Sequence, residues 1–78
     1  MLDKYRKIEH YEERFGSLAI EKGFISQGEL SMAQAVHTHE EAKNGIYRHL
    51  GDILFFQGNM SANQVEEVVK VVLSRKDN

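Results

Sequence analysis

The chain contains no cysteine and no proline, and none of its apolar runs is long. Without cysteine it can form neither a disulfide nor a thiolate metal site, and this absence fits a reducing compartment. The longest apolar stretch, around residues 53–56, is far too short to span a bilayer. The N-terminus, MLDKYRKIEHYEER, is charged throughout and lacks the apolar segment of a secretory signal. We therefore expect a cytoplasmic protein that does not enter a membrane.

Neither sign of charge dominates the sequence. Its 12 acidic and 10 basic side chains give a net charge of −2. Binding to DNA or RNA depends on a basic surface that neutralises phosphates, so we expect no nucleic acid partner. The lack of proline and the many charged residues suit an all-helical domain. A core of 78 residues supplies little net stability, so the chain needs good local structure or a partner.

The sequence contains an internal repeat. Residues 15–36 and 50–71 align without a gap at an offset of 35 residues, and apolar positions mostly fall on apolar positions. A repeat of this length usually marks a supersecondary unit that cannot bury its apolar face alone. The identical pairs are Gly16 with Gly51, Gly23 with Gly58, and Ser26 with Ser61.

The first unit has the signals of a helix, a tight turn and a second helix. Apolar residues recur at helical spacing and predict a helix over about 3–22, which Gly23 ends as a left-handed C-cap. Ser26 and Glu29 have the spacing of a capping box, which predicts a second helix up to about residue 43. The inner side of this second helix is expected to carry Leu30, Ala33 and Val36, with His37 as a further candidate.

The second unit follows the same pattern. Gly58 ends a third helix, and Ser61 with Gln64 forms a second capping box. The valine-rich last segment has strand propensity, but its cap and its helical spacing favour a helix. The third helix is expected to carry Tyr47, Leu50, Ile53 and Leu54 as its apolar stripe, and the fourth Val65, Val68, Val69, Val72 and Leu73.

These signals predict an all-α fold of four helices, built as two repeated helix–turn–helix units packed as a small bundle. We expect a single domain over residues 1–78, with repeat one at about 14–37 and repeat two at about 49–73. Residues 1–13 are expected to be an N-terminal helical extension.

No residue pattern indicates catalysis, so we expect a non-enzymatic protein without a cofactor. Ser26 and Ser61 are assigned to helix caps, and no cysteine is present. His37 with Glu40 or Glu41 has the spacing of two ligands on one helix face, but a structural zinc site needs four, and we expect no metal. The acidic pairs are interpreted as solvated carboxylates on outer helix faces: Glu12-Glu13, Glu40-Glu41 and Glu66-Glu67.

Gly16 and Gly51 are the positions that folding alone explains least well. Each is placed one turn into its repeat's first helix, where glycine costs roughly 0.5–1 kcal/mol relative to alanine. One interpretation is close helix–helix approach. The other is that the bare backbone lets a flat or anionic ligand approach, with Arg14 or His49 as a neighbouring donor.

Two stretches resemble a known family. Residues 14–33 read R-F-G-x-L-x-I-x-x-G-F-I-S-x-x-E-L-x-x-A, and residues 50–65 read L-G-x-I-L-x-x-x-G-x-M-S-x-x-Q-V. Together they resemble the duplicated N-terminal domain of type II secretion and type IV pilus assembly ATPases, of the GspE and MshE type. The resemblance covers about three quarters of the chain.

This resemblance implies a bacterial helical domain linked to secretion or pilus machinery. In the MshE subgroup the doubled motif binds cyclic di-GMP, with the arginine and the glycine backbone near the ligand and apolar residues under its bases. Carried over to this chain, with the two donors beside the second motif, it implies a site made of Arg14, Phe15, Gly16, Leu30, Arg48, His49, Leu50, Gly51 and Val65.

Two functions follow from these patterns. The first is a non-enzymatic protein-interaction module that docks on a protein partner or on itself, since the first and last helices carry more apolar surface than so small a domain can hide. The second is a cyclic di-GMP receptor, motivated by the duplicated R-F-G and H-L-G starts.

Overall fold

The computed structural model describes the backbone of residues 2–74 and the side chains of residues 10–74. The described residues form four helices and no strand, which confirms the all-α prediction. The helices are α1 (Leu2–Glu21), α2 (Gln27–Asn44), α3 (Leu50–Phe56) and α4 (Ala62–Ser74).

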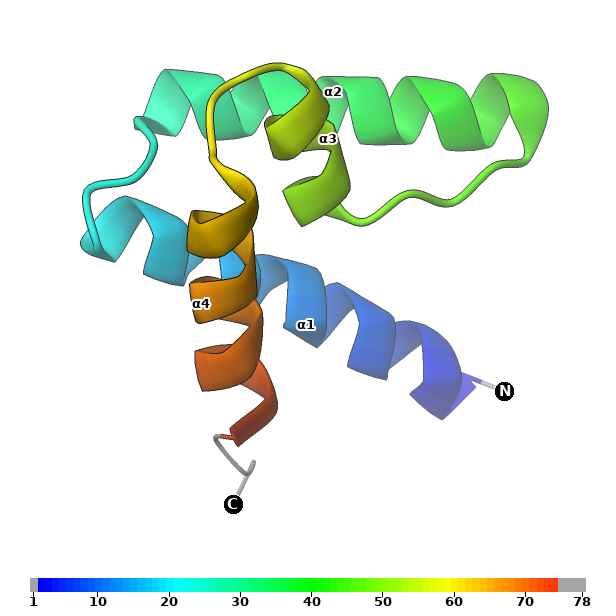
Figure 1. Ribbon diagram of the computed structural model, residues 1–78. Coiled ribbons are helices and arrows are strands. Elements are labelled where there is room, and N and C mark those ends of the chain that lie inside the picture. Colours follow the sequence, from blue (N-terminus) through cyan, green and yellow to red (C-terminus); the bar gives the residue numbers. More distant parts are fainter. Residues whose placement is uncertain (1, 75–78) are drawn as a thin grey trace.

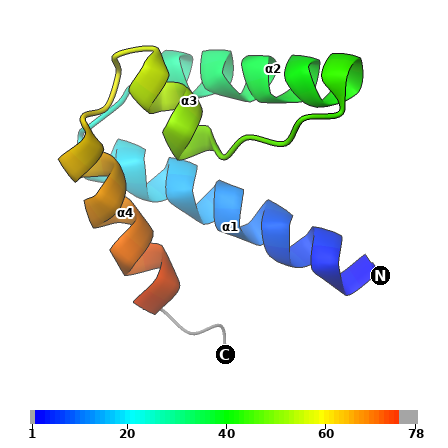
Figure 2. The same cartoon turned by 45° about the vertical axis from the view of Figure 1, so that its right-hand side comes forward.

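The two pairs of helices, α1 with α2 and α3 with α4, pack into each other and do not form two separate pairs. The long helices α1 and α2 diverge from their connecting turn, and α3 lies between them, as Figures 1 and 2 show. The most extensive contacts join α2 with α3 and α1 with α4. Each helix of the first unit (α1 and α2) is therefore covered mainly by a helix of the second unit (α3 and α4).

Two tight turns end the first helix of each unit in the same way. Gly23 and Gly58 adopt left-handed conformations, with φ of 78° and 79°. The residue after each glycine donates its backbone N–H to a carbonyl five residues earlier: Phe24 to Ala19 and Asn59 to Leu54, both at 2.9 Å. Glycine suits these positions because it has no Cβ to clash at positive φ.

Both predicted capping boxes are present. The hydroxyl of Ser26 accepts from the N–H of Glu29 at 3.1 Å, and the Glu29 carboxylate accepts from the N–H of Ser26 at 2.8 Å. Ser61 and Gln64 make the same two bonds at 3.1 and 3.0 Å. These bonds satisfy backbone donors that the first turn of a helix otherwise leaves without partners.

The core lies where the units interlock. Among the described residues, no polar or charged side chain belongs to it, and Phe15, Leu54 and Val68 are its largest fully buried members. Tyr11, Ile20, Phe24, Val65, Val69 and Val71 pack against its edge. The other buried members are Leu18, Ala19, Ile25, Leu30, Ala33, Leu50, Ile53, Met60 and Val72.

The sequence pattern assigned Tyr47, Val36 and Leu73 to the buried faces of helices, and the structure places these three residues elsewhere. Tyr47 precedes α3, which begins at Leu50, and lies in the connecting segment. Val36 is exposed, whereas the next residue, His37, is half-buried against the segment before α3, so Val36 lies at the edge of the covered face of α2. Leu73 is 69 % exposed although Val72 beside it is buried, so Leu73 lies on the uncovered face of α4.

Candidate functional site

The space left by the two glycines is occupied by side chains of the chain itself. A Cβ added at Gly16 would lie 3.0 Å from both terminal methyls of Leu30. One added at Gly51 would lie 2.9 Å from Cζ of Phe15 and 3.0 Å from Cγ1 of Val65. Leu30 and Val65 occupy positions 35 residues apart, as the glycines do, so the same contact recurs in both units. The geometry favours close helix approach as the reason for both glycines.

The glycines differ in their place along the helix. Gly51 is the second residue of α3, whereas Gly16 lies deep within α1, far beyond its first turn. The expectation that each sits one turn into its helix is therefore wrong for both, because α1 begins at Leu2, well before the repeat, and α3 begins at Leu50, immediately before Gly51.

The apolar members of the predicted site lie in the core. Phe15 and Leu50 are 1 % and 2 % exposed, and Leu30 is buried as well. Val65 is half-buried against the core. A base that stacked on Phe15 or Leu50 would therefore have to displace core contacts first.

The three basic residues of the predicted site lie in three different parts of the molecule. Arg14 lines an open groove between α1 and α4, whose apolar floor is Leu18 and Val72. The guanidinium of Arg48 pairs with Glu40 of α2, with Nε 3.3 Å from the carboxylate. His49 faces α1 instead. The groove lined by Arg14 includes neither Arg48 nor His49.

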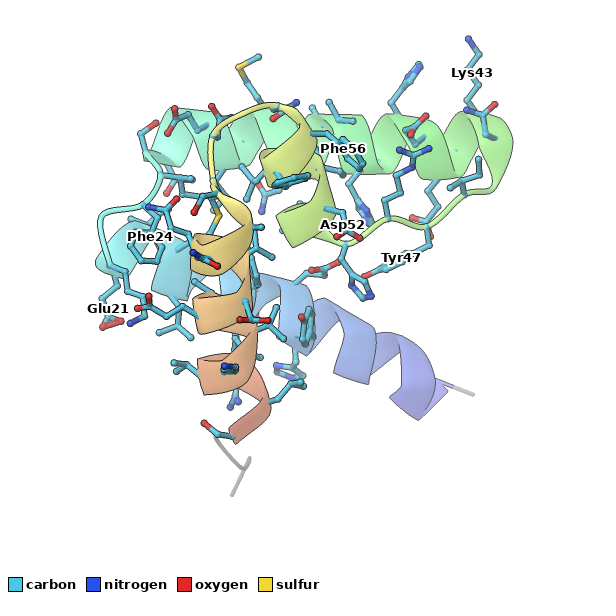
Figure 3. The ribbon with its side chains drawn as sticks, viewed as in Figure 1. Glu21, Phe24, Lys43, Tyr47, Asp52 and Phe56 are labelled. Atoms are coloured by element: carbon cyan, nitrogen blue, oxygen red, sulfur yellow. The ribbon has the colours of Figure 1, made fainter. Side chains whose placement is uncertain are left out.

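A cluster of carboxylate, imidazole and phenol groups lies where α1, α2 and the start of α3 meet. We name it the Glu12 cluster; its members are Tyr11, Glu12, His37, Tyr47 and His49. Tyr47 projects from the segment between α2 and α3, as Figure 3 shows. The rings make edge-to-face contacts, with centroids 4.8 to 5.3 Å apart, in the order His37, Tyr47, His49, Tyr11.

Glu12 is the acceptor at the centre of this cluster. Its carboxylate accepts from the hydroxyl of Tyr47 at 2.6 Å and lies 3.2 Å from Nδ1 of His49. It also accepts, at 3.4 Å, from the N–H of Leu50, the first residue of α3. His49 is the N-cap residue of α3 but makes no capping bond with its own side chain. The carboxylate from α1 therefore caps α3 in its place, where negative charge is favoured by the helix dipole.

The cluster changes the acidity of its two phenols. Burial, and then the hydrogen bond to the Glu12 carboxylate, raise the pKa of Tyr47 well above the ordinary tyrosine value. Burial, and then the charges of Glu12 and Asp52, also raise the pKa of Tyr11. Both phenols therefore remain protonated hydrogen-bond donors at neutral pH.

His37 ties the connecting segment to α2. Its Nδ1 lies 2.8 Å from the backbone carbonyl of Arg48. A carbonyl oxygen only accepts, so this nitrogen carries the hydrogen. The other ring nitrogen faces the carboxylate of Glu41 at 4.0 Å. His37 and Glu41 are thus neighbours, as their spacing predicted. Across residues 10–74, however, no three His, Asp or Glu side chains are placed to hold a metal ion.

The sequence pattern misassigned Glu12, which was interpreted as a solvated carboxylate. Its side chain is only 12 % exposed. A signal was present: Glu12 precedes Phe15 by three residues and Ala19 by seven, so it lies on the same helical stripe as two core residues. A carboxylate on a core stripe needs partners, and Tyr47 and His49 supply them.

Several large apolar side chains are exposed on the described surface. Phe56 is 74 % exposed and contacts Phe55, itself 45 % exposed, edge to face at 5.5 Å. Phe56 is labelled at the end of α3 in Figure 3. The position equivalent to Phe56 in the first unit is Glu21, which is also exposed. The other exposed members are Met32, Val36, Ile46 and Leu73.

Comparison with known proteins yields no match: no family model, no curated protein and no solved structure is similar to the chain. Among the helices that the structure describes, none combines the length and apolar character needed to cross a bilayer.

Proposed function

We propose that this protein is a small non-enzymatic interaction module that docks on another protein chain, either a different protein or a second copy of itself. The observation that carries the proposal is the exposed aromatic pair Phe55 and Phe56 at the end of α3. Adjacent exposed aromatic residues are costly to leave in water and are typical of the centres of protein interfaces. We place the module in the cytoplasm, and the family resemblance suggests secretion or pilus machinery as the setting.

The first unit supports a role for Phe56 outside folding. The equivalent residue there, Glu21, is exposed at the end of α1, where the same turn follows. A charged residue is thus compatible with this position of the fold. An aromatic residue at the second position adds apolar surface that the isolated chain leaves uncovered.

Site-specific cross-linking tests this proposal. A photoreactive phenylalanine analogue at Phe56 should cross-link to one defined protein, or to a second copy, in the producing cells. The same analogue at Lys70, an exposed residue of α4, is the control. Phe56→Glu should abolish the interaction and leave the thermal unfolding of the isolated chain unchanged. Cross-linking at Phe56 no greater than at Lys70 would contradict the proposal.

A cyclic di-GMP receptor is the second candidate. It is supported by the resemblance and by the recurrence of the glycine contacts at Gly16 and Gly51. We rank it second because Phe15, Leu30 and Val65 fill the surfaces that the nucleotide would need. Calorimetry with cyclic di-GMP tests it. Binding that Arg14→Ala weakens would favour the receptor, whereas no heat at roughly millimolar ligand, a concentration at which even weak specific complexes form, would exclude it.

A further inference from the structure

The junction between α2 and the segment that follows it consists of an Asn–Gly pair. Asn44 is the last residue of α2, and Gly45 is its C-cap, with φ of 67° in the left-handed region. Residues 45–49, which we call the linker, lead from there to the start of α3. The side-chain amide of an asparagine is most readily attacked by the next backbone nitrogen when that nitrogen belongs to glycine, because glycine has no side chain to shield it. The pair is therefore a candidate for a reaction within the chain.

The surroundings of the pair leave both reacting groups accessible. Asn44 and Gly45 are exposed. A Cβ built on Gly45 would meet no atom within 4 Å, so no distant side chain covers that side of the glycine. The amide of Asn44 donates to the carboxylate of Glu40, but the distance from Nδ2 to Oε2 is 3.5 Å, which is long for a hydrogen bond. This contact is too weak to hold the amide in one rotamer.

A single backbone hydrogen bond protects the pair while α2 is intact. The N–H of Gly45 donates to the carbonyl of Glu41 at 3.0 Å. An amide nitrogen attacks a carbonyl carbon only after it has lost its proton, and this bond retains the proton. The reaction therefore requires the last turn of α2, residues 41–44, to open.

The last turn of α2 has few contacts that keep it closed. Residues 41–44 are all exposed. Among the described residues, their hydrogen bonds and ion pairs reach no other helix. The C-terminal end of α2 projects beyond α3 in both ribbon views (Figures 1 and 2). Helix ends without tertiary contacts open at little cost in free energy, far more often than the whole chain unfolds.

We propose that Asn44 is a site of spontaneous covalent modification, at which the opened end of α2 converts to aspartate or isoaspartate. The Gly45 nitrogen loses its proton to solvent and attacks Cγ of Asn44. The new C–N bond closes a five-membered succinimide ring, and the side-chain nitrogen leaves as ammonia. Water then opens the ring: attack at the side-chain carbonyl gives aspartate, and attack at the backbone carbonyl gives isoaspartate. No atom is oxidised or reduced.

Either product weakens the junction. It places a negative charge at the C-terminal end of α2, where the helix dipole disfavours it. It also replaces the donor that faces Glu40 with a carboxylate, so that like charges lie four residues apart. In isoaspartate the backbone is one carbon longer, so the N–H of Gly45 no longer reaches the carbonyl of Glu41 with helical geometry. The modification therefore keeps the end of α2 open and releases the start of the linker.

Peptide mapping of the full folded chain, incubated at neutral pH and physiological temperature, tests this site. Aspartate and isoaspartate should accumulate at position 44 before they appear at Asn59 or Asn63, which are each followed by a residue with a side chain. Asn44→Gln should abolish the product, because attack on the longer side chain would close a less favourable six-membered ring. Earlier conversion at Asn59 or Asn63 would overturn the proposal. A folded chain still unmodified at position 44 long after a peptide of residues 40–48 is fully converted would overturn it too.

Two alanine-to-glycine variants test whether the last turn controls the rate. Ala42 is exposed in that turn, and Ala35 is exposed in the middle of the same helix. Glycine lowers the stability of a helix, so Ala42→Gly should raise the rate of conversion at Asn44 by up to about fivefold. Ala35→Gly should leave the rate unchanged, because position 35 lies more than two turns from the pair. Equal rates in Ala42→Gly and the wild type would contradict the proposed opening step.

The effect on the linker is measured on the separated product. Ion-exchange chromatography isolates the modified chain by its additional negative charge. Its backbone amides at residues 44–46 should exchange with solvent faster than those of the unmodified chain. Equal exchange in the two forms would show that the modification does not keep the end of α2 open.

Discussion

The carboxylate of Glu12 in α1 accepts a 2.6 Å hydrogen bond from the hydroxyl of Tyr47, which lies 35 positions later in the chain. The same carboxylate meets the first amide of α3. This one acidic side chain therefore joins α1 both to the first turn of α3 and to the linker, residues 45–49, that leads into it. None of the linker residues is helical, so the linker does not itself start α3.

The Tyr47 contact predicts a loss of stability in alkali. Folding raises the pKa of Tyr47, so the folded chain holds the phenolic proton more tightly than the unfolded chain. The stability that this contributes is complete below about pH 10, the ordinary tyrosine pKa, and is lost as pH rises beyond it. The urea midpoint should therefore fall above about pH 10. Tyr47→Phe should lower the free energy of unfolding at neutral pH by about 1 kcal/mol and should make this fall less steep. An equally steep fall in the variant would contradict the assignment; a smaller residual slope is expected from Tyr11.

Gly51→Ala should destabilise the fold, because the new Cβ would lie 2.9 Å from Phe15 and 3.0 Å from Val65. Overpacking of this kind costs about 1–3 kcal/mol, more than the helix propensity that alanine gains. Gly28→Ala is the matched control, since Gly28 is also the second residue of its helix and its Cβ would meet only Ser26 Oγ, at 3.8 Å. Urea unfolding should show a loss for the first variant and no loss for the second. Equal effects would show that the Phe15 contact does not limit position 51.

The two capping boxes should contribute similar stability. Ser26→Ala and Ser61→Ala each remove the hydroxyl that accepts from the third residue of the helix, at 3.1 Å in both cases. Each should cost about 1 kcal/mol. Ser17→Ala, at an exposed position within α1, should be neutral or slightly stabilising. Differential scanning calorimetry of the three variants measures these differences, and a neutral Ser61→Ala would show that the second box has little energetic weight.

Two substitutions in α3 should separate folding from docking. Leu54 is fully buried, and Leu54→Ala should cost about 2–5 kcal/mol, enough to unfold most molecules of a domain this small. Phe56 is 74 % exposed, and Phe56→Ala should change stability by less than about 0.5 kcal/mol. Far-ultraviolet circular dichroism during heating distinguishes them. A large loss of stability in Phe56→Ala would assign that residue to the core and weaken the docking proposal.

The helices could be predicted from sequence because their limits are encoded locally. Ser26 and Glu29 are three residues apart, and Gly23 ends its helix through its own backbone conformation. Each signal involves only a few neighbouring residues, and the structure bears out both.

The cluster around Glu12 could not be predicted in the same way. Its partners lie 35 to 38 residues away, and the start of α3 depends on a carboxylate supplied by α1. Tyr47 has helical spacing relative to Leu50 and Leu54, so the pattern placed it within the helix. Only tertiary contact shows that it belongs to the linker. The exposure of Val36 beside half-buried His37 likewise depends on which face of α2 the chain covers, and only tertiary contact decides that.

The interlocked order of the helices has a consequence for how the chain can be divided. Since α1 packs mainly with α4 and α2 mainly with α3, a cut in the linker would yield two fragments that each lack their principal covering helices. Neither fragment should fold alone, whereas a mixture should recover the helical signal. The same geometry permits two chains to exchange halves through an opened linker and form an intertwined dimer that keeps the α1–α4 and α2–α3 contacts.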